Sequence, residues 1–301
     1  MENKKLNAKI GGQALIEGIM MRNKDTVSMA VRLKNNKIDT ENFKIKFLEK
    51  FKWCKNIPIL RGIIEMIVSF SIGYKCLLKS AQKAEFEEHN KKEKYNNSTI
   101  FNVFTGISAV IGIAITIILF MLLPSVATKQ LNEFLYFNNF FKVLFEGIIK
   151  ISIFIIYILI MSKLPDVRRT FEYHGAEHKT IACFESNVAL TPQNVKKFTR
   201  FHPRCGTNFI FIVLITSIFI FSFLTWKNLF IRLVLKFSLL PLITGIAYEL
   251  IRLAGRNSNI ITKILITPGL LLQRLTTKEP NEEQIEVAIC AVNELIKNTK
   301  Q

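Results

Sequence analysis

The segment "FEYHGAEHKTIACFE", residues 171–185, carries the side chains with the clearest chemistry in the chain. It contains His174, Glu177 and His178 in the array H-x-x-E-H. On a helix, histidines four residues apart project from one face about one turn apart, so both imidazoles can reach one metal ion. In zinc hydrolases with this inverted array, the glutamate is the general base that takes a proton from water. The spacing therefore predicts a metal site in which Glu177 is catalytic.

A second group of metal-binding side chains follows in "FHPRCG", where His202 and Cys205 place an imidazole and a thiol three residues apart. Three of the four histidines of the chain thus fall within 29 residues. The two pairs are separated as the ligand pairs of zinc sites often are. We expect His174, His178, His202 and Cys205 to hold zinc, although another divalent transition metal would also fit these ligands.

Two questions stay open for this site. If all four side chains bind the ion, the tetrahedron is closed and the zinc is structural, whereas three ligands and a water molecule make it catalytic. Glu177 and Glu185 favour the catalytic arrangement. Without a metal, His174 and His178 would be a hydrogen-bonded pair in the core beside Glu177. Three nearby cations could bind an anionic substrate or a lipid phosphate, or could simply face solvent and head groups: Lys179, Arg200 and Arg204.

The N-terminal stretch "KIGGQALIEGIMMRNK" raises a separate question, because Gly11, Gly12 and Gln13 precede an apolar run. In release factors this tripeptide tips a long soluble domain, and a phosphate-binding loop would need a Lys-Ser or Lys-Thr pair before a helix. The remaining interpretation is a glycine pair that lets the backbone pass close to a ligand. Glu17 would then be a second acid at the metal cleft, as a ligand or as the partner of a histidine. The alternative is a structural bulge with Glu17 on the surface, paired with Arg22.

Four motifs together, "GGQALIEGIMMR", "YHGAEHKTIACFE", "RFHPRCGT" and "TPGLLLQRLTTKEP", resemble the bacterial YqhQ-like family. Its members are membrane proteins of unknown function that are described as predicted metal-dependent enzymes. The motifs span residues 11–280, nearly the full chain. The resemblance implies a membrane architecture and a metal site, and it names no reaction. It also implies that two sets of residues act as functional elements: Gly11, Gly12, Gln13, Glu17, Gly18 and Arg22 near the N-terminus, and Gln273, Thr276, Thr277 and Glu279 near the C-terminus.

The elements that must position these residues are largely apolar, since half of the 301 residues are hydrophobic and 25 are phenylalanine. The 23 residues from 101 to 123 carry no charge and are long enough to cross a hydrocarbon core of roughly 30 Å. Residues 208–226 form a second uncharged run. The apolar stretches 143–161 and 229–251 span as well if their few charges pair or face protein. We predict four transmembrane helices, with a re-entrant hairpin at 208–254 as the alternative.

Basic residues gather before the first predicted span and between the second and third. This distribution predicts a multi-pass cell-membrane protein with both termini and the metal site in the cytoplasm. The net charge of +18 favours anionic lipid head groups as partners, and no recognition motif accompanies it that would favour nucleic acid. Five cysteines on the reducing side indicate thiols or metal ligands rather than disulfides. No signal peptide is expected, since the first 56 residues are polar and basic.

Outside the spans, residues 9–48 alternate like strands around a turn at 34–37. Residues 57–84 have the pattern of an interfacial helix, on which Arg61 and Glu65 are spaced to pair. The expected fold is therefore mainly α-helical, with about four transmembrane helices, a small N-terminal antiparallel β element and a cytoplasmic helical metal-binding loop.

The predicted organisation follows the chain in six segments, the last of which contains a turn at 267–269 and an amphipathic helix at 281–297. The segments are a cytoplasmic β element (1–56), an interfacial helix with a charged linker (57–97), transmembrane helices one and two (98–161), the metal-binding loop (162–207), transmembrane helices three and four (208–254) and a C-terminal cytoplasmic tail (255–301).

Three functions fit this sequence, in order of preference. The first is a metal-dependent hydrolase, peptidase-like or lipid-directed, at the cytoplasmic face. The second is a non-enzymatic membrane scaffold or regulator whose zinc is structural. The third is a small-solute transporter that uses the charges within its spans, Glu146, Lys150 and Glu249. The substrate, and whether the chain forms a homo-oligomer, stay open.

Overall fold

The computed structural model of the chain describes residues 10–45, 52–85, 98–136, 138–224, 229–254 and 259–299. Its N-terminal part is a four-stranded antiparallel sheet with the strands in sequence order, which confirms the predicted β element. The strands are β1 (Gly11–Leu15), β2 (Gly18–Asn23), β3 (Thr26–Arg32) and β4 (Ile38–Lys44). The predicted turn at 34–37 is confirmed, with Asn36 in the left-handed conformation (φ 63°) that asparagine tolerates. The predicted strand residues 46–48 lie outside the described part of the chain.

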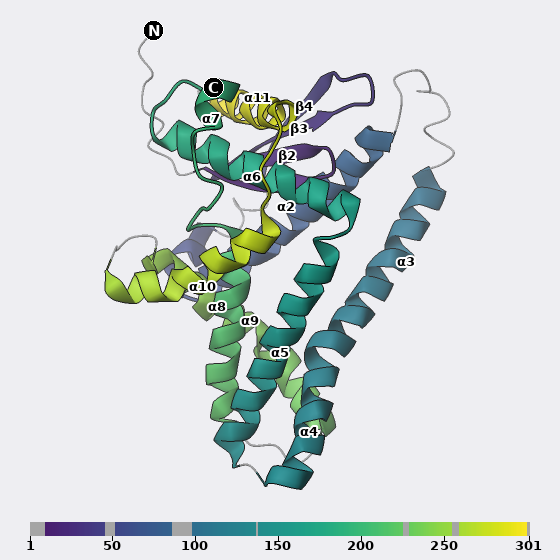
Figure 1. Cartoon of the computed structure of the whole chain (residues 1–301), viewed down its shortest axis with the longest axis vertical. Coiled ribbons are helices and arrows are strands. Elements are labelled where there is room, and N and C mark those ends of the chain that lie inside the picture. Colours follow the sequence, from purple (N-terminus) through teal and green to yellow (C-terminus); the bar gives the residue numbers. More distant parts are fainter. Residues whose placement is uncertain are drawn as a thin grey trace.

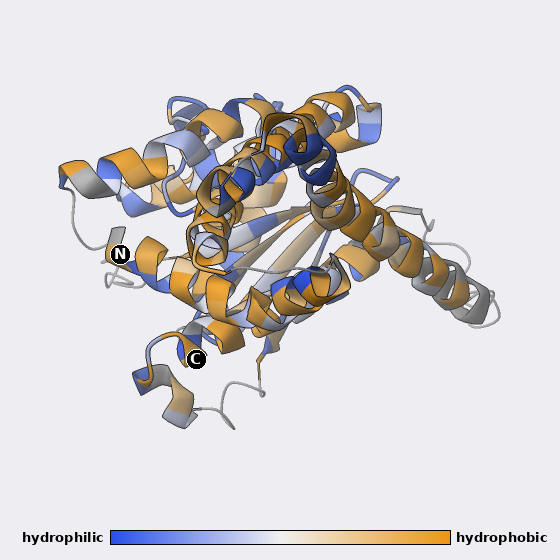
Figure 2. Cartoon of the chain, turned by 90° about the horizontal axis from the view of Figure 1, so that it is seen from below, coloured by the Kyte–Doolittle hydropathy of each residue, from blue (hydrophilic) through white to orange (hydrophobic). Residues whose placement is uncertain are grey.

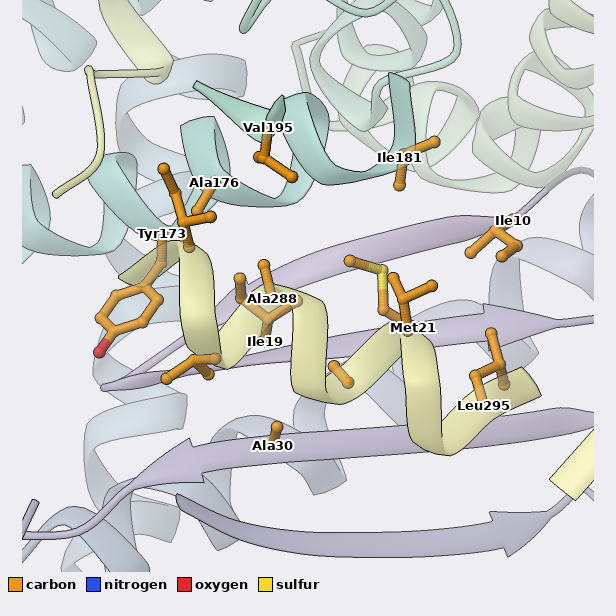
Figure 3. Packing of buried hydrophobic residues seen from close by; sticks show 14 of the residues in the cluster. Ile10, Ile19, Met21, Ala30, Tyr173, Ala176, Ile181, Val195, Ala288 and Leu295 are labelled. Atoms are coloured by element: carbon orange, nitrogen blue, oxygen red, sulfur yellow. The ribbon is translucent and has the colours of Figure 1, made fainter. Parts of the chain in front are cut away.

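The sheet is buried on both faces. On one face, Val27, Met29 and Val31 pack against the helix α2 (Leu60–Glu85). Alternate residues of a strand point to opposite faces, so Ile19 of β2 meets the other layer. That layer consists of the helices α6 (Pro165–Glu185) and α11 (Glu282–Thr299), which lie side by side over the sheet (Figures 1 and 3). The predicted helices at 57–84 and 281–297 are therefore confirmed, and the two ends of the chain fold into one packed unit. We call this unit the head.

Below the head, the chain runs through long apolar helices (Figure 1). In the part of the chain that the structure describes, three helical stretches are long and apolar enough to cross a membrane: Gly106–Leu135, Phe140–Met161 and Phe230–Leu253. Seen from below, they are hydrophobic over most of their surface (Figure 2). The fourth predicted span is the helix α8 (Gly206–Ser222), which is apolar but shorter than the other three. The mainly helical fold with its N-terminal antiparallel sheet is therefore confirmed, and of the four predicted spans three have spanning length among the described residues.

The first of these stretches is longer than the sequence predicted. The predicted span ends at residue 123, directly before Pro124, but helix continues through α3 (Ser98–Ile117), the π-helical turn η3 (Ile118–Leu122) and α4 (Leu123–Leu135). Proline lacks the N–H group that a helix interior needs, and it clashes with the preceding turn. The wider π-helical turn directly before Pro124 makes room for it, so the helix ends only at Tyr136, which is left-handed (φ 46°).

A second proline also fails to end a helix. The predicted turn at 267–269 is wrong, because α10 (Ile260–Thr276) continues through Pro268. Thr267 Oγ1 donates to the carbonyl of Lys263 one turn earlier, at 2.7 Å, which satisfies one backbone acceptor near the proline. Gly269 is needed for packing instead: a Cβ atom there would overlap the side chain of Asn208 on α8.

Two predicted charge pairs are replaced by longer-range ones. Arg61 does not pair with Glu65 along α2; its Nε donates to Glu249 on α9 at 2.6 Å. Glu65 instead accepts from Arg22 of β2 at 2.9 Å, so Arg22 does not pair with Glu17. The remaining elements are η1 (Lys52–Asn56), α5 (Asn139–Met161), α7 (Pro192–Val195) and α9 (Leu229–Ala254).

Candidate metal centre

Three side chains predicted as ligands meet where the head joins the apolar helices. His174 and His178 lie one turn apart on α6, and their ring centroids are 4.4 Å apart. Cys205 caps the start of α8, and its Sγ atom lies 3.1 Å from Nε2 of His174. One ligand atom from each of the three side chains lies within 4.8 Å of the other two. This buried or half-buried group could hold a metal ion.

Backbone carbonyls fix the orientation of both imidazoles. Nδ1 of His174 lies 2.8 Å from the carbonyl oxygen of Thr276, and Nδ1 of His178 lies 2.5 Å from that of Arg200. A carbonyl only accepts, so each Nδ1 carries the proton and each Nε2 keeps its lone pair on the side of Cys205. Metal-binding histidines are usually held in this way by a partner on the other ring nitrogen. This arrangement aims the Nε2 atoms as metal binding would require.

The chemistry of the three donors fits zinc or a similar transition metal. Two imidazoles and one thiol form a nitrogen and sulfur set, which suits zinc and not magnesium or calcium. Burial lowers the pKa of His178, although its contact with Cys205 opposes the shift, so the ring stays in the neutral form that binds metal. Three protein ligands would leave the fourth tetrahedral position open.

Glu177 lies between the two histidines in the sequence and is 4% exposed. Burial raises the pKa of its carboxyl group, against the attraction of His174 and His202. Among the described residues its carboxylate has no hydrogen-bond partner. Its neighbour is Gly12 of β1, where a Cβ atom would lie 2.7 Å from Glu177 Oε1. The glycine pair thus brings the backbone of β1 directly against this carboxylate.

His202, the fourth expected ligand, lies outside the group. Its ring centroid is 5.5 Å from that of His178, and its Nε2 is 4.0 Å from a carboxylate oxygen of Glu185. The side chain of Gln273 holds its backbone, with two hydrogen bonds of 2.8 Å. Glu185 also pairs with Arg204; although burial opposes it, hydrogen bonds from His202 and Arg204 lower the pKa of Glu185. The structure thus groups three ligand atoms rather than four.

Comparison with known proteins places this architecture in a family. Residues 57–298 match the family described as "Protein of unknown function (DUF1385)". The chain belongs to the DUF1385 family. It is 33% identical over 303 residues to the "Uncharacterized protein YqhQ" of Bacillus subtilis (strain 168), a match that covers 99% of this chain and 95% of the relative. No solved structure matches the chain.

The part of the chain that matches DUF1385 contains all three grouped ligands and Glu177, but not the N-terminal sheet. The residues of the N-terminal motif contact two different parts of this DUF1385 protein. Gly12 faces Glu177, whereas the side chain of Gln13 packs on Gly73 of α2. Glu17 lies in the turn between β1 and β2 (φ 51°) and is engaged by α6: Arg169 forms a salt bridge with it, and the Tyr173 hydroxyl donates to it at 3.2 Å. Glu17 is thus not in the metal group.

The C-terminal motif serves the site through its backbone and amide groups, which the sequence did not reveal. The carbonyl of Thr276 orients His174, and the carbonyl of Thr277 accepts from Arg200 at 3.2 Å. In this DUF1385 protein, Gly175 of α6 lets the chain after α10 cross closely, because a Cβ atom there would overlap the carbonyl oxygen of Lys278. In the sequence, the motif as a whole was the signal that these residues belong to the site, because a residue that acts through its backbone carbonyl can carry almost any side chain.

The cations predicted to bind an anion are mostly matched by acids. Lys179 Nζ lies 2.7 Å from a carboxylate oxygen of Glu279, and Arg200 Nε lies 3.8 Å from the other oxygen. Arg204 pairs with Glu185. These three side chains therefore brace the loop around the candidate metal centre, and an anionic substrate would have to compete with their carboxylate partners.

Proposed function

We propose that this protein is a zinc-dependent hydrolase that acts at the cytoplasmic face of the membrane on a peptide or a lipid. The observation that carries the proposal is the position of Glu177. It is a buried carboxylate without a hydrogen-bond partner among the described residues, next to three grouped metal donors. A buried charge is costly unless it is paired or used, so its retention favours a chemical role.

The residues take distinct roles in this proposal. His174, His178 and Cys205 would hold the zinc ion, which when bound lowers the pKa of a water molecule and polarises the bond to be cleaved. Glu177 would accept the proton of that water, and its raised pKa makes it a better proton acceptor than an ordinary glutamate. The carbonyls of Thr276 and Arg200 would keep both imidazoles in the metal-binding tautomer.

The helix α10 supports a substrate that arrives from the membrane surface. It lies across the region where the head meets the spans (Figure 1). Three of its large apolar side chains are exposed: Ile260, Ile264 and Leu271. The same helix ends at Thr276, whose carbonyl orients His174. An apolar surface that ends at the metal centre favours a lipid or a membrane-bound peptide over a small polar solute.

A structural zinc is the second candidate, and one observation favours it. The donors join α6 to the first residues of α8, and both imidazoles also hold backbone carbonyls of neighbouring segments. An ion there would tie these segments together in a scaffold or regulator. On this alternative Glu177 has no chemical role, so replacing it should leave function intact.

The test is to purify the full chain in detergent and measure zinc content and hydrolysis in the same samples. Fluorogenic casein and phosphatidylglycerol vesicles are the two substrate probes. We expect about one zinc per chain in the wild type and in Glu177→Gln, with hydrolysis lost in Glu177→Gln only. Glu172→Gln is the matched control, because Glu172 lies on the same helix and bonds to Gln284, away from the ligands. Equal activity in Glu177→Gln and the wild type, or no hydrolysis by any sample, would contradict the proposal.

A further inference from the structure

A second polar cluster lies inside the apolar helices. It is formed by Glu146 and Lys150, four residues apart on α5, and by Arg232 and Lys236, four residues apart on α9. All four side chains are buried. Glu146 precedes Met161, the end of α5 nearest the head, by fifteen residues, which corresponds to about 22 Å along a helix axis. The cluster is therefore separate from the metal centre and lies toward the opposite end of the spans.

Glu146 is the centre of this cluster. Its carboxylate forms salt bridges with both Arg232 and Lys236. Lys236 Nζ also donates to the Ser125 hydroxyl of α4 at 2.8 Å, so three helices meet here. Among the described residues, Glu146 is the one carboxylate in these salt bridges. Among the described residues, three basic side chains thus lie with one carboxylate in an apolar setting.

Lys150 is the basic side chain of the cluster that lacks a direct acidic partner among the described residues. The residue is 9% exposed, and its Nζ has no hydrogen-bond or salt-bridge partner among the described residues. Glu146 attracts it only at longer range. Lys150 Nζ lies 5.8 Å from the ring centroid of Phe221 on α8, and Lys236 Nζ lies 5.9 Å from the same centroid. Two ammonium groups thus converge on one aromatic ring, although like charges repel and ionised groups are costly within a membrane.

We propose that this cluster binds a phosphate-class anion, taken either from a lipid head group or from free phosphate. Lysine and arginine are the side chains that bind phosphate oxygens, lysine as a point charge and arginine as a fork of donors. One anion between α5 and α9 would give Lys150 the partner it lacks and would offset the positive charge of the basic side chains. Glu146 would keep Arg232 and Lys236 turned toward the same space. This inference does not depend on the hydrolase proposal, because it uses none of the residues of the metal centre.

The first test is thermal unfolding of the purified full chain while phosphate replaces chloride at constant ionic strength. A ligand that binds only the folded state raises Tm in a saturable manner. We expect such a rise for the wild type, and for Lys150→Met we expect at least a tenfold higher half-saturating phosphate concentration. Lys150→Arg, which keeps the charge, should stay within a few-fold of the wild type. Lys142→Met is the matched control, since Lys142 is a half-buried lysine on the same helix two turns earlier.

The second test separates the two sources of the anion and compares nanodiscs of phosphatidylcholine with and without phosphatidylglycerol. Stabilisation by phosphatidylglycerol that is lost in Lys150→Met would support the inference with a lipid head group as ligand. Stabilisation by inorganic phosphate alone, with the same dependence on Lys150, would support it with a free anion as ligand. If neither stabilises the wild type, or if Lys150→Met responds as the wild type does, the cluster is a purely structural network and the inference is overturned. The wild-type measurements decide this even if a variant fails to fold.

Discussion

At the scale of single residues, the contact between Gly12 and Glu177 links the glycine pair to the metal-binding motif, which the sequence offered as one of two alternatives. A Cβ atom at position 12 would lie 2.7 Å from Glu177 Oε1, so Gly12→Ala should push the carboxylate out of place. A catalytic group misplaced by about 1 Å can cost 10²-fold in rate, so we expect turnover to fall by about 10- to 100-fold with zinc retained. Gly11→Ala is the matched control, because a Cβ atom there meets nothing within 4 Å. Equal turnover in the two variants would show that Glu177 tolerates displacement.

The ligand set is a second prediction at this scale. Cys205→Ala removes one of the three grouped donors and should abolish stoichiometric zinc binding, whereas His202→Ala should keep about one zinc per chain. His202 lies beside the group, next to Glu185, and losing such an outer partner typically weakens metal affinity by about 10- to 100-fold. Elemental mass spectrometry after dialysis against a weak chelator measures both. Zinc loss in His202→Ala as complete as in Cys205→Ala would restore the four-ligand site that the sequence suggested.

At the scale of elements, the structure depends on close crossings that require glycine. In most helices Gly→Ala is stabilising by about 0.5–1 kcal/mol. At Gly175, however, a Cβ atom would overlap the Lys278 carbonyl, which is backbone and cannot rotate away. We therefore expect Gly175→Ala to destabilise the head by about 1–3 kcal/mol, a typical cost of overpacking. Gly206→Ala is the control, because a Cβ atom there meets nothing within 4 Å. Urea unfolding followed by tryptophan fluorescence compares them, and a Gly175→Ala variant as stable as the wild type would contradict the tight crossing.

Elements that depend on local sequence patterns could be predicted from the sequence, whereas features that depend on contacts between distant segments could not. Strand alternation at 26–44 and the apolar stripe of α11 are local patterns, and both are confirmed. Pro124 and Pro268 are also local signals, but a π-helical turn accommodates Pro124 and α10 continues through Pro268. Helix therefore extends past the predicted end of the first span at 123, and the predicted turn at 267–269 is wrong. The grouping of His174, His178 and Cys205 followed from their spacing. The position of His202 did not, because it depends on how Gln273, 71 residues later in the chain, holds its backbone.

At the scale of the whole molecule, the two candidate sites lie far apart along the apolar helices. The candidate metal centre lies where α6 of the head meets the start of α8, and the cation cluster lies about 22 Å along α5 from the end of that helix nearest the head. The two ends of the chain close the head together, since α11 packs on the sheet formed by residues 11–44. If the head is cytoplasmic, as the distribution of basic residues predicts, the two sites face opposite sides of the membrane.

This orientation gives the last prediction. Tyr136 ends α4 at the far tip of the spans and is 87% exposed, whereas Lys34 is exposed in the hairpin between β3 and β4 of the head. We expect Tyr136→Cys to react with a membrane-impermeant maleimide in intact cells, and Lys34→Cys to react only after permeabilisation. The native chain is the background control, because four of its five cysteines are buried. Labelling in the reverse order would place the metal centre outside the cell, where a thiol ligand meets an oxidising environment and the proposed cytoplasmic hydrolase could not operate.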